Sequence, residues 1–79
     1  MDNVYQLYLR DLGNLVKEAA RTAKTDYGGS SEDERSDFNL GRLSAMHEIV
    51  SLMQQQAEAF GLSLAELEIE DIDPDRDLL

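Results

Sequence analysis

Apolar residues between positions 38 and 60 recur at steps of three and four residues, the spacing typical of one face of an α-helix. One row, called here the Leu43 row, contains Leu43, Met46, Val50, Met53, Ala57 and Phe60. An adjacent row, called the Phe38 row, contains Phe38, Ala45, Ile49, Leu52 and Ala59. Because the two rows together are wider than one helix–helix contact requires, we expect a second protomer or another protein to cover part of this helix. The predicted dimer or partner interface consists of Leu43, Met46, Ile49, Val50, Met53 and Phe60.

A second amphipathic pattern lies near the N-terminus and predicts a helix over residues 3–26. Its apolar positions form the Tyr5 row, which contains Tyr5, Tyr8, Leu12, Leu15 and Ala19. Asn3 and Gln6 have the spacing of a capping box at the start of this helix. Gly13 interrupts the pattern, at a cost of about 1 kcal/mol relative to alanine, and we interpret it as a place where another helix packs closely.

The polar, glycine- and serine-rich residues 28–37 separate the two patterns and are few enough to reverse the chain. Gly28 and Gly29 are expected to end the first helix, and Lys17, Arg21 and Lys24 lie where cations favour its negative end. The second helix is expected to begin between Ser31, which forms a capping box with Glu34, and Asp37. It should run to Phe60, with Gly61 as the left-handed residue and Leu62 closing a Schellman contact to Ala57. These signals predict an all-α fold built on an antiparallel helical hairpin, residues 1–62.

The remaining residues, 63–79, form a short acidic C-terminal segment. Ser63 and Glu66 predict one capped helical turn over residues 64–67. Between Glu66 and Asp77 there are seven acids and one arginine, a net charge of −6. The carboxylates predicted to face a partner are Glu68, Glu70, Asp71, Asp73, Asp75 and Asp77. Apolar residues alternate with them, which we interpret as an extended segment with apolar anchors at Leu67, Ile69, Ile72, Leu78 and Leu79.

Composition favours self-association. A chain of 79 residues buries a modest core, and small domains are usually reinforced by disulfides, metals or oligomerisation. With no cysteine and one histidine, oligomerisation is the remaining route. A net charge of −10 disfavours direct contact with nucleic acid or an anionic membrane, and no segment has the form of a signal peptide or membrane span, so we expect a cytoplasmic protein.

Candidate chemistry is sparse. Asp71, Asp73, Asp75 and Asp77 alternate as in the first half of a calcium-binding loop, but Arg76 replaces the required glycine and no closing glutamate follows. His47 lacks the companions of a metal or catalytic motif and shares a mainly polar stripe with Ser51 and Gln54, so we interpret it as a surface or interface histidine. We therefore predict no catalytic residue, no metal and no cofactor. The alternative is a metal-dependent carboxylate site assembled from two chains.

These observations predict a small acidic protein-binding module that is not an enzyme. It would dimerise into a four-helix bundle and present its acidic segment to a basic protein, which it binds or inhibits. A first alternative is a purely structural protein whose acidic segment packs on its own bundle. A second is a mimic of nucleic acid, in which the carboxylates occupy the basic groove of another protein.

Overall fold

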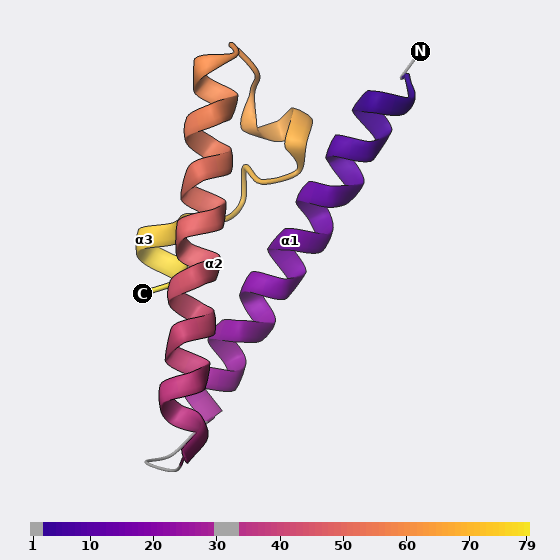
Figure 1. Cartoon of the computed structure of the whole chain (residues 1–79). Coiled ribbons are helices and arrows are strands. Elements are labelled where there is room, and N and C mark those ends of the chain that lie inside the picture. Colours follow the sequence, from indigo (N-terminus) through magenta and orange to yellow (C-terminus); the bar gives the residue numbers. More distant parts are fainter. Residues whose placement is uncertain (1–2, 30–33) are drawn as a thin grey trace.

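The computed structural model describes residues 3–29 and 34–79, and within them the chain is all-helical (Figure 1). Two long helices, α1 (Val4–Gly29) and α2 (Glu34–Ala59), pack against each other as an antiparallel hairpin. A short 3-10 helix, η1 (Leu64–Leu67), and one helical turn, α3 (Pro74–Asp77), follow. The predicted helical hairpin is therefore confirmed. The capping box expected at Ser31 lies outside the described residues.

Local capping signals decide where most of these elements begin and end. Asn3 Oδ1 accepts from Gln6 N at 2.9 Å, and Gln6 Oε1 accepts from Asn3 N at 3.1 Å, which is the predicted capping box. Helix α1 continues through both glycines, past its predicted end at residue 26, because Tyr27 packs against the core and keeps the last turn in place. Helix α2 begins at Glu34, inside the predicted interval.

The C-terminal end of α2 is a complete Schellman motif. Gly61 adopts a left-handed conformation with φ of 70°. Leu62 N donates to Ala57 O at 2.8 Å, and Gly61 N donates to Glu58 O at 3.1 Å. Directly afterwards, Ser63 and Glu66 form the predicted capping box of η1. These tight turns send the rest of the chain back along the hairpin.

The returning chain, residues 62–79 and hereafter the tail, supplies much of the hydrophobic core. Figure 1 shows α1 and α2 diverging away from their connection, with η1 between them; η1 contacts α1, and α3 contacts α2. Four tail residues are buried, Leu67, Ile69, Ile72 and Leu78. They pack with Ala20 of α1 and with Leu43, Val50 and Ala57 of α2. Of the five predicted apolar anchors, these four tail residues are thus buried and Leu79 is exposed. The tail folds into η1 and α3 where an extended segment was expected.

The buried side of α1 differs from the one that its apolar pattern suggests. Gly13, Lys17, Ala20 and Ala23 are buried, whereas every member of the Tyr5 row is exposed. The small side chains of Ala20 and Ala23 allow α2 to approach closely, and Gly13 does the same for the tail. Large residues of the Tyr5 row are left facing outward.

Candidate interaction surfaces

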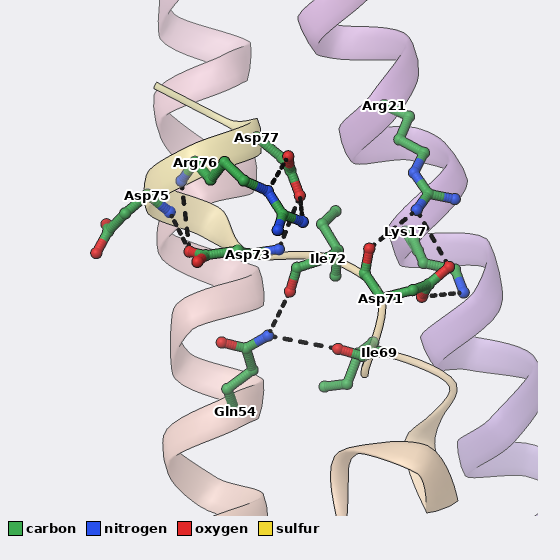
Figure 2. Close-up of polar contacts among 10 residues, drawn as sticks. All are labelled: Lys17, Arg21, Gln54, Ile69, Asp71, Ile72, Asp73, Asp75, Arg76 and Asp77. Atoms are coloured by element: carbon green, nitrogen blue, oxygen red, sulfur yellow. Dashed lines mark hydrogen bonds and ion pairs between the residues drawn. The ribbon is translucent and has the colours of Figure 1, made fainter.

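An ion-pair cluster joins α1 to the tail (Figure 2). Asp71 lies between two cations of α1: Lys17 Nζ is 2.8 Å from its Oδ1, and Arg21 Nη2 is 3.2 Å from its Oδ2. The same Arg21 nitrogen donates to the Asp71 carbonyl oxygen at 3.3 Å. Lys17 is the buried partner, since its side chain retains 10 % exposure. A buried ammonium requires such a partner, so Asp71 fixes the tail against α1.

The electrostatic effect of this cluster falls on Asp71. Hydrogen bonds from Lys17 and then from Arg21 lower its pKa from 3.8 to about 2. Two further contacts extend the connection along α1: Arg10 Nη2 is 3.4 Å from Glu68 Oε1, and Lys24 Nζ donates to the Leu79 main-chain oxygen at 2.6 Å. Four basic residues of α1 therefore contact the tail, at Glu68, Asp71 and Leu79.

Gln54 holds the tail against α2 (Figure 2). Its Nε2 donates to the carbonyl oxygen of Ile72 at 2.9 Å and to that of Ile69 at 3.4 Å. Both carbonyls belong to residues whose side chains are buried, so the amide satisfies acceptors next to the core. Nearby, His47 Nε2 lies 2.9 Å from Asp75 Oδ1. The polar stripe of α2 is thus the side on which the tail docks.

The alternating aspartates build α3. Asp73 caps it by accepting from Asp75 N at 3.0 Å and Arg76 N at 3.4 Å, and Pro74 occupies the first helical position. Asp77 Oδ2 accepts from Asp73 N at 2.9 Å and pairs with Arg76 at 2.8 Å. These bonds hold the pKa of Asp77 well below its usual range. Within residues 3–29 and 34–79, no three histidines or acids are grouped in a way that suits a metal ion.

Among the six carboxylates predicted to face a partner, most contact their own chain. Glu68 and Asp71 pair with α1, whereas Asp73 and Asp77 cap and brace α3. Asp75 reaches His47 but keeps 84 % of its side chain exposed. Glu70 is also exposed. Glu70 and Asp75 are therefore the exposed carboxylates of this set that neither pair with α1 nor brace α3.

The six predicted interface residues fall into three groups. Leu43 and Val50 are buried in the core of the single chain, so they present no surface to a partner. Met46 and Met53 are half-buried and pack against that core. Ile49 and Phe60 are exposed. The tail and α1 together cover most of the Leu43 row.

The Phe38 row stays exposed from end to end, as does the Tyr5 row. Successive residues of an α-helix are about 100° apart, so a residue two positions away lies on the opposite side. Leu15 is two positions from Lys17, and Leu52 is two positions from Gln54. Since Lys17 and Gln54 contact the tail, Leu15 and Leu52 lie on the sides of their helices opposite these contacts.

A polar contact joins the lines of the two rows near the connection of α1 and α2. Asp26 lies on the line of the Tyr5 row, seven residues after Ala19, and Arg42 lies on the line of the Phe38 row, between Phe38 and Ala45. Arg42 Nη1 lies 2.9 Å from Asp26 Oδ2. At the opposite end, an apolar groove of about 260 Å³ includes Leu12, Phe60 and Leu67 in its walls. The two rows, which are joined near the connection of the hairpin by the ion pair of Arg42 and Asp26, are hereafter called the apolar face.

Two sequence patterns indicate the contacts of the tail and the start of α3. Arg10, Lys17, Arg21 and Lys24 lie on one side of α1, a spacing that indicates a basic strip able to bind the acidic tail. Asp73 followed by Pro74 is a helix-start signal that predicts α3. Neither signal says whether the tail binds its own helix or another protein.

Comparisons with protein-family models, with curated proteins and with solved structures returned no match. No helix in the described part of the chain combines the length and the apolar character needed to cross a membrane.

Proposed function

We propose that this chain is a non-enzymatic protein-binding module that works as a homodimer in the form of a four-helix bundle. The observation that carries the proposal is the apolar face. Large side chains such as Tyr5, Leu15 and Leu52 remain more than half exposed after the tail has completed the core. Extended apolar surfaces of this kind mark interaction sites on small proteins.

The acidic and histidine side chains support a binding role more than a catalytic one. Asp73 and Asp77 are used to cap α3, Asp71 neutralises Lys17, and His47 bonds to Asp75. Each of these groups has a structural task within its own chain. Catalysis needs groups positioned toward a substrate, so this use of the acids favours binding.

The first test is the mass of the full chain in solution, measured by light scattering over a range of concentrations. We expect twice the 8.9 kDa of one chain at tens of micromolar protein. A single-chain mass at these concentrations would contradict the proposal. Circular dichroism on the same samples would verify that the protein under test is helical.

A basic protein is the proposed partner of the dimer. Several cations of the chain pair with its own acids, including Lys17, Arg21 and Arg42. The net charge of −10 therefore belongs to carboxylates such as Glu70 and Asp75 that extend into solvent. Opposite charge steers association and selects partners.

This partner class can be examined with a lysine-rich model peptide. Substituting E70Q together with D75N removes two negative charges from the tail. The matched control, D11N with E18Q, removes two exposed charges from α1. We expect the tail variant to lose more affinity than the control, and equal losses would contradict recognition by the tail.

A purely structural role is the second candidate, and the burial of Leu67, Ile69, Ile72 and Leu78 favours it. In that case the tail completes the core and its acids keep the chain soluble. The same peptide experiment separates the two roles, because a structural tail gives no preference between the two double variants.

A further inference from the structure

We infer that a second copy of this chain covers the apolar face, so that the Tyr5 row and the Phe38 row form the central seam of the four-helix bundle. This inference rests on the proposed function and specifies its interface. It moves the interface away from the Leu43 row, whose central residues Leu43 and Val50 are already buried in the single chain.

The first argument is the spacing of the rows. Positions 5, 8, 12, 15 and 19 follow alternating steps of three and four residues, which is the heptad repeat of helices that pack at a small crossing angle. Positions 38, 45, 49, 52 and 59 fit the same repeat on α2. A face that carries two such seams on antiparallel helices is complementary to another copy of itself.

The second argument is charge. Two copies with a net charge of −10 each repel one another wherever their acids meet. The rows consist of uncharged residues, although 30 % of the chain is charged. The charged residues aligned with them, Arg42 between Phe38 and Ala45 and Asp26 after Ala19, pair with each other. Two copies can therefore meet here without bringing unpaired carboxylates together.

The third argument is size. An α-helix with side chains is about 10 Å wide, and the rows are about 21 Å and 32 Å long, so the face measures roughly 500 Å² in projection. Its large side chains are between 38 % (Leu12) and 77 % (Tyr5) exposed. The face falls within the range of the largest apolar patches on soluble proteins, about 300–600 Å², which are often functional.

The test compares leucine-to-glutamate substitutions on the apolar face and away from it. Leu15 and Leu7 lie on the same helix and are 54 % and 53 % exposed, but only Leu15 belongs to the face. Leu52 on the face and Leu40 outside it provide the corresponding pair on α2. Because all four side chains are already exposed, each variant should keep its helical circular dichroism spectrum.

We expect L15E and L52E to raise the dimer dissociation constant at least 100-fold, while L7E and L40E change it less than threefold. A dimer that survives both L15E and L52E would overturn this interface and leave the proposed dimer standing. Equal weakening by L7E and L15E would also overturn it.

The wild-type chain tests the dimer itself. A monomeric wild-type chain would overturn both the interface and the proposed function. An assembly larger than a dimer would overturn the four-helix form. If one face variant loses its helical spectrum, the variant on the other helix decides the result.

Discussion

The carbonyl oxygen of Leu67 lies against Gly13, at the place where any other residue would carry its β-carbon. The Leu67 carbonyl carbon is 2.9 Å from that position, and a methyl group of Ile69 is 3.6 Å from it. The close approach that Gly13 indicates is therefore made by the backbone of the 3-10 helix η1. This contact sets how deeply the tail enters between α1 and α2.

Replacing Gly13 with alanine should destabilise the protein despite alanine's higher helix propensity. The added carbon overlaps backbone that cannot rotate away, so we expect a loss of about 1–3 kcal/mol in the free energy of unfolding. Gly41 is the matched control, because it lies in α2 with nothing within 4 Å of an added β-carbon. There the same substitution should gain about 0.5–1 kcal/mol. Urea denaturation measures both, and a stabilising G13A would contradict the observed packing.

Removing the amide donor of Gln54 should loosen the tail from α2. Glutamate has nearly the same shape but cannot donate, so Q54E leaves the carbonyl oxygens of Ile69 and Ile72 without their side-chain partner. We expect a loss of about 1–3 kcal/mol, measured by urea denaturation. Q55E adds the same charge at an exposed neighbouring position and is the control. If both variants lose the same stability, the effect is one of charge and not of the hydrogen bonds.

The ion pair of Asp71 predicts a loss of stability in acid. Because the folded pKa is lowered from 3.8 to about 2, the unfolded chain takes up the proton first as the pH falls. The stabilisation from Asp71 is therefore complete above about pH 5 and is lost as the pH falls through 2. D71N should be less stable than the wild type at pH 7, and the difference should shrink steadily below pH 5 and be small at pH 2. E70Q is the control, and a wild-type advantage that is as large at pH 2 as at pH 7 would argue against this pair as the cause.

A chain ending at Leu62 keeps the Schellman motif but loses the four buried side chains of the tail. Burying a large apolar side chain contributes about 1.5–3 kcal/mol, so their combined loss is comparable to the whole stability of a small domain, about 5–15 kcal/mol. We expect the shortened chain to lose its cooperative thermal transition. L79A alters an exposed tail residue and should keep that transition. A shortened chain that unfolds cooperatively at an unchanged temperature would show that the hairpin is stable without the tail.

The bounds of the elements were the most predictable part of this protein. The Asn3–Gln6 cap, the Gly61–Leu62 Schellman motif and the Ser63–Glu66 cap all lie where their spacing predicts. Each depends on hydrogen bonds between residues at most five positions apart, so the local sequence contains all the partners. The four-helix bundle and its partners stay predictions.

The sequence by itself determined two long helices, their caps and an apolar surface too large for one helix contact. Only the tertiary structure decided which part of that surface is covered. Helix α1 could bury either the large side chains of the Tyr5 row or the side that carries Gly13, Ala20 and Lys17, and its own periodicity favours the first. The tail selects the second, because its backbone fits against Gly13 and its Asp71 neutralises Lys17. These contacts join residues more than fifty positions apart, which a local pattern cannot pair, and they leave the Tyr5 row free on the outer face.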